Sequence, residues 1–202
     1  MSAIADFSEL VLAVGEHINR TDLVDVMPRF VRMAELKLDR ELRLRDQEAS
    51  DDLTTDADGE VALPTDFLEV RSIYVTGSPP IIIPALSEDN SIMEFTAGTA
   101  RGFIINGDTL RIRPAAVATV RLNYFSSIPA LETSTNQVNW LLTKYPDIYL
   151  YTTIFEAAVY TGDTDRAGAA DGLARAAIAS AMRYSKLSKL SRARVRVGGL
   201  CP

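Results

Sequence analysis

Residues 145–162 read YPDIYLYTTIFEAAVYTG and define a helix in the last third of the chain. Pro146 can open this helix because proline suits a first helical turn. Gly162 can end it because glycine enters the left-handed conformation without strain. Asp163 is then placed to cap a second helix, which is rich in alanine. On that helix we expect one face to carry Leu173, Ala177, Ala181 and Tyr184.

Two further helices are expected at the N-terminal end. The first carries apolar residues at helical spacing, namely Ile4, Phe7, Leu10, Val11, Val14 and Ile18. The second can begin at Pro28. From Arg29 to Arg45, the face opposite its apolar stripe is charged. Its inner stripe is Phe30, Val31, Ala34, Leu38 and Leu42.

The middle of the chain is predicted to be rich in strands. An acidic, turn-rich stretch at 49–60 leads into short apolar runs separated by Pro and Gly. The expected strands are 61–63, 67–75, 81–83, 103–105, 110–113 and 119–125, with a short helix at 87–95. Asn106-Gly107 predicts a tight hairpin turn, since this pair favours positive φ angles.

This order predicts an α+β fold. The N- and C-terminal helices would pack into a helical bundle with an inserted central β-rich lobe, followed by an extended C-terminal arm. The expected bounds are 1–48 for the N-terminal helices, 49–135 for the lobe, 136–185 for the C-terminal helices and 186–202 for the basic arm.

The charges of this 202-residue chain are divided unevenly. The net charge is −6, yet the last acidic residue is Asp171 and seven lysines and arginines follow it. Residues 1–171 therefore carry about −13 and the rest about +7. Such a division indicates that the C-terminal segment binds a different partner from the body.

The common catalytic, cofactor and membrane signatures are missing from the sequence. His17 is the only histidine and Cys201 the only cysteine, which argues against zinc sites and catalytic triads. The run Asp56-Ala57-Asp58-Gly59 resembles a calcium loop, but Thr54 and Thr65 stand at its first and last ligand positions, which favours a turn. We therefore expect no catalytic residues, cofactor, metal, membrane span or secretory signal.

The candidate binding residues lie in the C-terminal arm. They are Arg183, Lys186, Lys189, Arg192, Arg194, Val195, Arg196 and Val197. From residue 193 to 197, small apolar and basic side chains alternate, a pattern suited to adding a strand to another protein's sheet edge. Two alternatives stay open. One is a solvated tail, and the other is a small DNA-binding or regulatory protein that uses these charges on phosphates.

An aromatic cluster around residue 145 also has two interpretations. It could form a binding surface, because aromatic residues dominate interface hot spots, or it could anchor a helix to the core. Its members are Trp140, Tyr145, Tyr149, Tyr151 and Phe155.

Three stretches together resemble the head-to-tail adaptors of short-tailed phages, also called tail tubular A-type head-completion proteins. The first is residues 28–46 followed by 63–73, with Leu63-Pro64-Thr65-Asp66-Phe67 at the start of its second part. The second is the hairpin at 106–108 followed by 110–114. The third is residues 139–151 running into 156–158 and 162–165.

The resemblance implies a structural virion protein rather than an enzyme. It implies a ring of twelve copies beneath the portal protein, which extends the DNA channel and joins it to a tail nozzle or tail tube protein. Genomic DNA would pass through the lumen without sequence-specific binding. It also implies that the C-terminal arm docks on the portal while the β lobe faces the tail. The arm residues listed above are assigned by charge and position alone.

Overall fold

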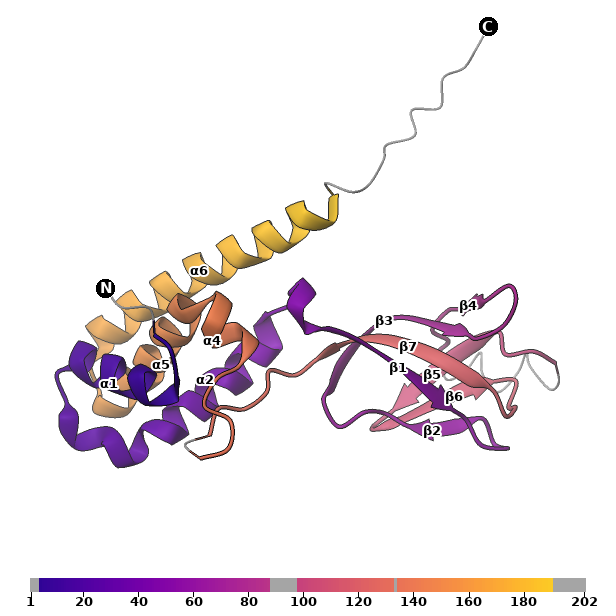
Figure 1. The fold of residues 1–202 in the computed structure, drawn as a ribbon, viewed down its shortest axis with the longest axis horizontal. Helices are drawn as coiled ribbons and strands as arrows, with labels where there is room; N and C mark the ends of the chain where they lie inside the picture. The colour runs from indigo at the N-terminus through magenta and orange to yellow at the C-terminus, as the bar shows by residue number, and fades with distance from the viewer. Residues whose placement is uncertain (1–3, 88–97, 133, 191–202) are drawn as a thin grey trace, which may run out of the picture. The chain divides into compact units, whose positions relative to one another are not determined.

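The computed structural model describes residues 4–87, 98–132 and 134–190, and it mixes helices with antiparallel strands (Figure 1). The predicted α+β composition is therefore confirmed. The chain divides into two compact units, of which the first comprises residues 1–46 and 128–202 and the second residues 47–127. The first unit is helical, and the second contains the strands that the structure describes.

The helical unit begins with α1 (Phe7–Ile18), a 3₁₀ segment (Thr21–Val26) and α2 (Met27–Glu41). The Asp6 carboxylate accepts a hydrogen bond from the Glu9 N–H at 2.9 Å and so caps α1. Asn19 ends α1 at φ 54°, in the left-handed conformation that asparagine tolerates. Pro28 lies in the first turn of α2, as its sequence predicts.

The C-terminal part of this unit holds α4 (Trp140–Lys144), α5 (Pro146–Thr161) and α6 (Thr164–Leu190). Gly162 ends α5 at φ 75°, and the Asp163 carboxylate caps α6 by accepting the Arg166 N–H at 3.0 Å, so both predicted signals are confirmed. The short helix α4 was not expected.

The expected face of α6 with Leu173, Ala177, Ala181 and Tyr184 is exposed at both of its ends. Leu173 is 50% exposed and Tyr184 is 67% exposed. The buried face is one residue further along and consists of Ala167, Ala170, Ala174, Ile178, Ala181 and Ser185. The four alanines and Ser185 on this face let α6 approach α5 closely, while Leu173, Tyr184 and Leu187 are exposed.

The β unit consists of two antiparallel sheets. One has the strand order β1-β7-β3-β4 and the other β2-β6-β5. The bounds are β1 Glu48–Thr54, β2 Glu60–Ala62, β3 Phe67–Val75, β4 Ile81–Ile83, β5 Gly102–Asn106, β6 Thr109–Arg113 and β7 Thr119–Ser126. Apolar residues from both sheets share one core, including Ile73, Leu110, Ile112, Val120 and Leu122.

Six predicted strands are present within a residue or two, but β1 is a correction. The acidic stretch from residue 49 was expected to be turns, whereas Glu48–Thr54 pairs with β7 along its whole length. The turn begins only afterwards: the Asp56 carboxylate accepts the N–H groups of Asp58 and Glu60, and Gly59 has φ 77°. The calcium-like run is thus a turn closed by its own first aspartate.

The predicted hairpin joins β5 and β6 with a two-residue turn. Asn106 pairs with Thr109, so the turn residues are Gly107 and Asp108 rather than Asn106 and Gly107. Gly107 alone has a positive φ, 58°, which is typical of a type II′ turn. The short helix expected at 87–95 falls almost entirely outside the described residues.

Candidate docking surface and its support

The helical unit is held together by a core to which α1, α2, α4, α5 and α6 all contribute. Leu10, Met27, Leu38 and Ile148 are fully buried within it. Tyr149 is also fully buried, while the other four aromatic residues of the predicted cluster are partly buried against the same core. These aromatic residues therefore anchor α4 and α5, as the second interpretation expected.

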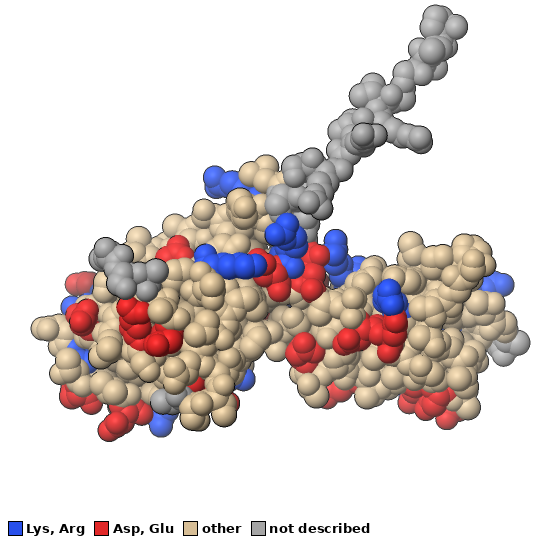
Figure 2. Space-filling model, in the orientation of Figure 1, with Lys and Arg blue, Asp and Glu red and all other residues tan. Residues whose placement is uncertain are grey.

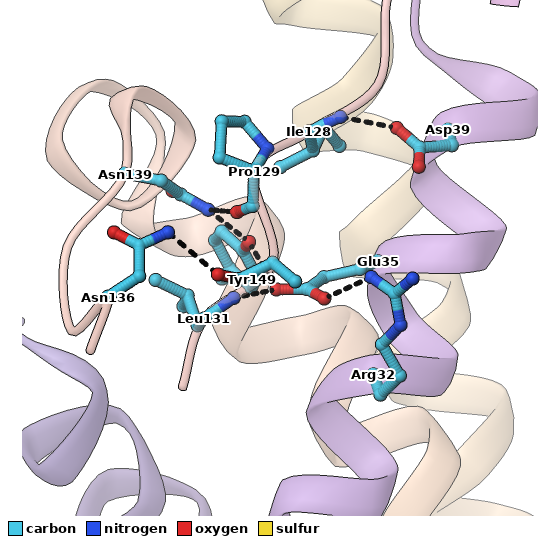
Figure 3. Close-up of polar contacts among 10 residues, drawn as sticks. Arg32, Glu35, Asp39, Ile128, Pro129, Leu131, Asn136, Asn139 and Tyr149 are labelled. Carbon is cyan, nitrogen blue, oxygen red and sulfur yellow. Dashed lines mark hydrogen bonds and ion pairs between the residues drawn. The ribbon is translucent and has the colours of Figure 1, made fainter. Parts of the chain in front are cut away.

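A buried carboxylate joins the returning loop to two helices (Figure 3). Glu35 on α2 is fully buried, and its Oε1 accepts hydrogen bonds from the Leu131 N–H at 2.7 Å and the Tyr149 hydroxyl at 3.0 Å. Its Oε2 pairs with Arg32 at 3.0 Å. Burial raises the pKa of Glu35, because removal from water disfavours the charged form.

Asn139 extends this network towards α4. Its side-chain amide donates to the Tyr149 hydroxyl and to the Pro129 carbonyl, each at 2.7 Å. Its carbonyl oxygen accepts the Leu142 N–H at 2.9 Å and caps α4. One side chain therefore ties the loop, the cap of α4 and the buried tyrosine of α5 together.

Asp39, one turn after Glu35, holds the start of the same loop. Its carboxylate accepts the Ile128 N–H at 2.8 Å (Figure 3). Burial also raises the pKa of Asp39. Sequence reasoning missed Glu35 and Asp39. The sequence does contain a sign that Glu35 is buried. It lies four residues after Val31 and three before Leu38, and so on the apolar stripe of α2.

Polar contacts also hold α6 along its length. The Arg166 guanidinium donates to the Ile18 carbonyl at 2.8 Å, and Asp171 pairs with Lys37 of α2 at 3.1 Å. Near the other end, the Ser185 hydroxyl accepts the Arg45 N–H at 3.0 Å. The helix is therefore fixed to the unit as far as Ser185, and its last residues continue beyond this contact.

The C-terminal half of α6 presents a basic and apolar surface. Arg183 and Lys186, three residues apart, are both exposed, and neither pairs with an acidic residue of the described chain. Tyr184 and Leu187 lie beside them in the sequence and are 67% and 60% exposed. We call Arg183, Tyr184, Lys186 and Leu187 the α6 end surface.

The remaining predicted binding residues lie beyond what the structure describes. Helix α6 reaches Leu190, so the predicted arm boundary at residue 186 falls inside the helix, but the side chain of Lys189 is not among those described. Arg192, Arg194, Val195, Arg196 and Val197 lie outside the described residues. Only Arg183 and Lys186 of the predicted set are thus brought together.

On the face that Figure 2 shows, Asp and Glu side chains gather in separate clusters on both units, with Lys and Arg side chains among them. In the described part of the chain, no group of three histidine, cysteine, aspartate or glutamate side chains is arranged to hold a metal ion. Over the same residues, no helix has the length and apolar character needed to cross a membrane.

Comparison with known proteins gives one positive result. A search of curated proteins finds no match. The family model described as SU10 adaptor protein matches residues 5–198, which is nearly the whole chain, including both units and most of the C-terminal arm. The chain therefore belongs to the SU10 adaptor protein family, a family of phage head-to-tail adaptors.

Proposed function

We propose that this protein forms a ring beneath the phage portal, twelve copies in number, which extends the DNA channel and joins it to the tail nozzle or tail tube. The observation that carries the proposal is the family match over residues 5–198. The family is one of structural phage adaptors and not an enzyme family. The protein would then occupy the head–tail interface.

The portal contact is assigned to the α6 end surface together with residues 188–202. The supporting observations are the exposed Arg183, Tyr184, Lys186 and Leu187 and the absence of any acidic residue after Asp171 in the sequence. Exposed aromatic and arginine side chains are the usual anchors of protein interfaces. The β unit would face the tail-side partner.

The first test separates the helix from the tail that follows it. A chain ending at Leu190 keeps α6 whole, and the double substitution Arg183→Glu with Lys186→Glu keeps the tail. We expect both to lose co-sedimentation with the cognate portal ring. Arg29→Glu with Arg40→Glu changes the charge equally at exposed positions of α2 and is the matched control. Full portal binding by both test variants would contradict the assignment.

The second test concerns the channel. We propose that the acidic body lines the lumen, where like-charge repulsion keeps passing DNA from being held. The chain ending at Leu190 should therefore show little duplex binding at low salt, and the full chain should bind only weakly and without sequence preference. Tight duplex binding by the truncated chain would contradict the lumen proposal. Sequence-selective binding by the full chain would instead favour a DNA-binding regulator.

A further inference from the structure

The helical unit carries a surface groove of about 540 Å³ between α1 and the first turns of α5. Its apolar lining residues, which we call the floor, include Leu12, Ala13, Leu150 and Tyr151. Leu12 is 63% exposed, a large fraction for a leucine on a helix that packs against a core. All the lining residues belong to the helical unit, so the groove is complete within it.

The rim of the groove is acidic. Glu9, Glu16 and Asp147 line it together with His17, and no lysine or arginine is among its lining residues. The Glu9 carboxylate accepts the Ala5 N–H at 2.7 Å through one oxygen, and Glu16 is exposed to solvent. An apolar floor with an acidic rim suits an extended peptide that carries both apolar and basic side chains.

The chain itself contains one segment with that chemistry. Residues 191–202 read SRARVRVGGLCP, with Arg192, Arg194 and Arg196 as the only charged side chains and Val195, Val197 and Leu200 between and after them. The body carries about −13 in residues 1–171, so the basic residues of this segment and the groove rim have opposite charge. In a free adaptor both belong to the same molecule.

The segment is long enough to reach the groove. Lys144, just before α5, pairs with Asp46, and the neighbouring Arg45 N–H donates to the Ser185 hydroxyl at 3.0 Å, so the start of α5 lies near Tyr184 and Ser185 of α6. From Tyr184 the helix continues for six residues, about 9 Å, to Leu190. The twelve residues that follow can span up to about 40 Å when extended, several times the ~9 Å back along α6 to Tyr184.

We propose that residues 191–202 dock in the groove of their own chain before assembly, with arginines on the acidic rim and valine and leucine side chains on the apolar floor. Binding within one chain is favoured because a short tether gives an effective concentration on the order of millimolar. Docking would keep the basic segment from non-specific contacts with nucleic acid until a portal ring competes for it. The groove contact itself does not require the proposed portal contact.

The position of Cys201 makes this testable by disulfide trapping in the full chain. Leu12→Cys places a second cysteine on the groove floor. Mild oxidation without portal should then join the introduced cysteine to Cys201 within a monomer, and mass spectrometry identifies this disulfide. Val24→Cys is the matched control, since Val24 is 48% exposed on the same unit but does not line the groove. We expect trapping at least about tenfold faster at position 12, because the tether acts on both positions and docking brings Cys201 to the groove alone.

A charge exchange tests the rim. Adding Glu16→Arg to Leu12→Cys should slow trapping about two- to fivefold, as for a partly exposed ion pair, and Arg196→Glu in the same chain should restore the rate. Equal trapping at positions 12 and 24, or a rate that ignores both charge changes, would overturn the proposal. Disulfides formed only between copies would overturn it as well. If trapping succeeds but portal addition leaves it unchanged, the groove contact stands and the portal assignment of the tail fails.

Discussion

Glu35 and Asp39 in the helical unit differ in their surroundings from Asp52 in the β unit. In the helical unit, Glu35 and Asp39 are buried and hold backbone N–H groups of the loop at 128–131. In the β unit, acids pair with arginines across exposed strand faces, as Asp52 does with Arg121 at 2.6 Å. A buried carboxylate leaves several donors unsatisfied when it is removed, whereas an exposed one is replaced by water. The stability of the helical unit should therefore depend on Glu35 and Asp39 far more than that of the β unit depends on Asp52.

The largest effect is expected for Glu35→Ala. The substitution leaves the Leu131 N–H and the Tyr149 hydroxyl without their buried acceptor, so we expect the free energy of unfolding of the helical unit to fall by about 3 kcal/mol. Trp140 is the only tryptophan and packs on the core of this unit, so its fluorescence reports the helical unit alone during denaturation. A change below about 1 kcal/mol would remove the distinction between the two units.

A smaller loss of stability is expected when glycines are replaced by alanine. Here the β unit should lose more stability than the helical unit. Gly59 has φ 77°, and a Cβ atom there would lie 2.9 Å from the Ile112 carbonyl oxygen. Gly162 has φ 75°, but a Cβ would meet nothing within 4 Å. Gly59→Ala should destabilise the β unit by about 2–3 kcal/mol, and Gly162→Ala should cost the helical unit only about 1 kcal/mol. Hydrogen exchange, followed separately for the strands and helices, measures both.

The stability of the helical unit should also depend on pH. Burial raises the pKa of Glu35 and of Asp39, so the folded helical unit binds their protons more tightly than the unfolded chain does. The stabilisation that these two groups give the folded unit is fully present at pH below their pKa values in the unfolded chain. It is lost as pH rises through their raised pKa values in the folded protein. The stability of this unit should therefore decline upward from about pH 4.5, and Glu35→Gln should flatten that decline. A decline of the same slope in the variant would rule out Glu35 as its source.

The smallest effect is expected for Asp52→Ala in the β unit. Its pairing with Arg121 lowers the pKa of Asp52, but both side chains are 44% exposed, so water and salt replace the interaction. The thermal midpoint of the strands should stay within experimental error of the unsubstituted protein. A clear loss of stability would show that the exposed pairs of this sheet matter as much as the buried acids of the helices.

The elements that the sequence predicted well are those with local signals. Pro146 and Gly162 mark α5, and the Gly107 turn marks the β5–β6 hairpin, because each depends on the conformational preference of one residue. Strand β1 was missed because its residues 50–52, Ser-Asp-Asp, are polar and exposed, and only their pairing with β7 makes them a strand. On α6, small residues give little contrast between faces, so the sequence did not indicate which face is buried.

The candidate site could be predicted only in part for a similar reason. Charge identified Arg183 and Lys186, which the structure shows to be exposed on one helix. The buried network of the same unit depends on the contact between Glu35 and Tyr149, which are 114 positions apart, and no local pattern encodes such a contact. The acid-rimmed groove arises in the same way from two helices that are distant in the sequence.

The chain enters the β unit through β1 and leaves it through β7, and these two strands are adjacent in the sheet. Glu48 at the start of β1 is the register partner of Phe125 near the end of β7, so the two crossing points lie about 5 Å apart. An insertion with its ends so close can be removed, lengthened or exchanged without moving the helices that flank it. Residues 47–127 can therefore diverge in sequence and length while the separate core of the helical unit is kept.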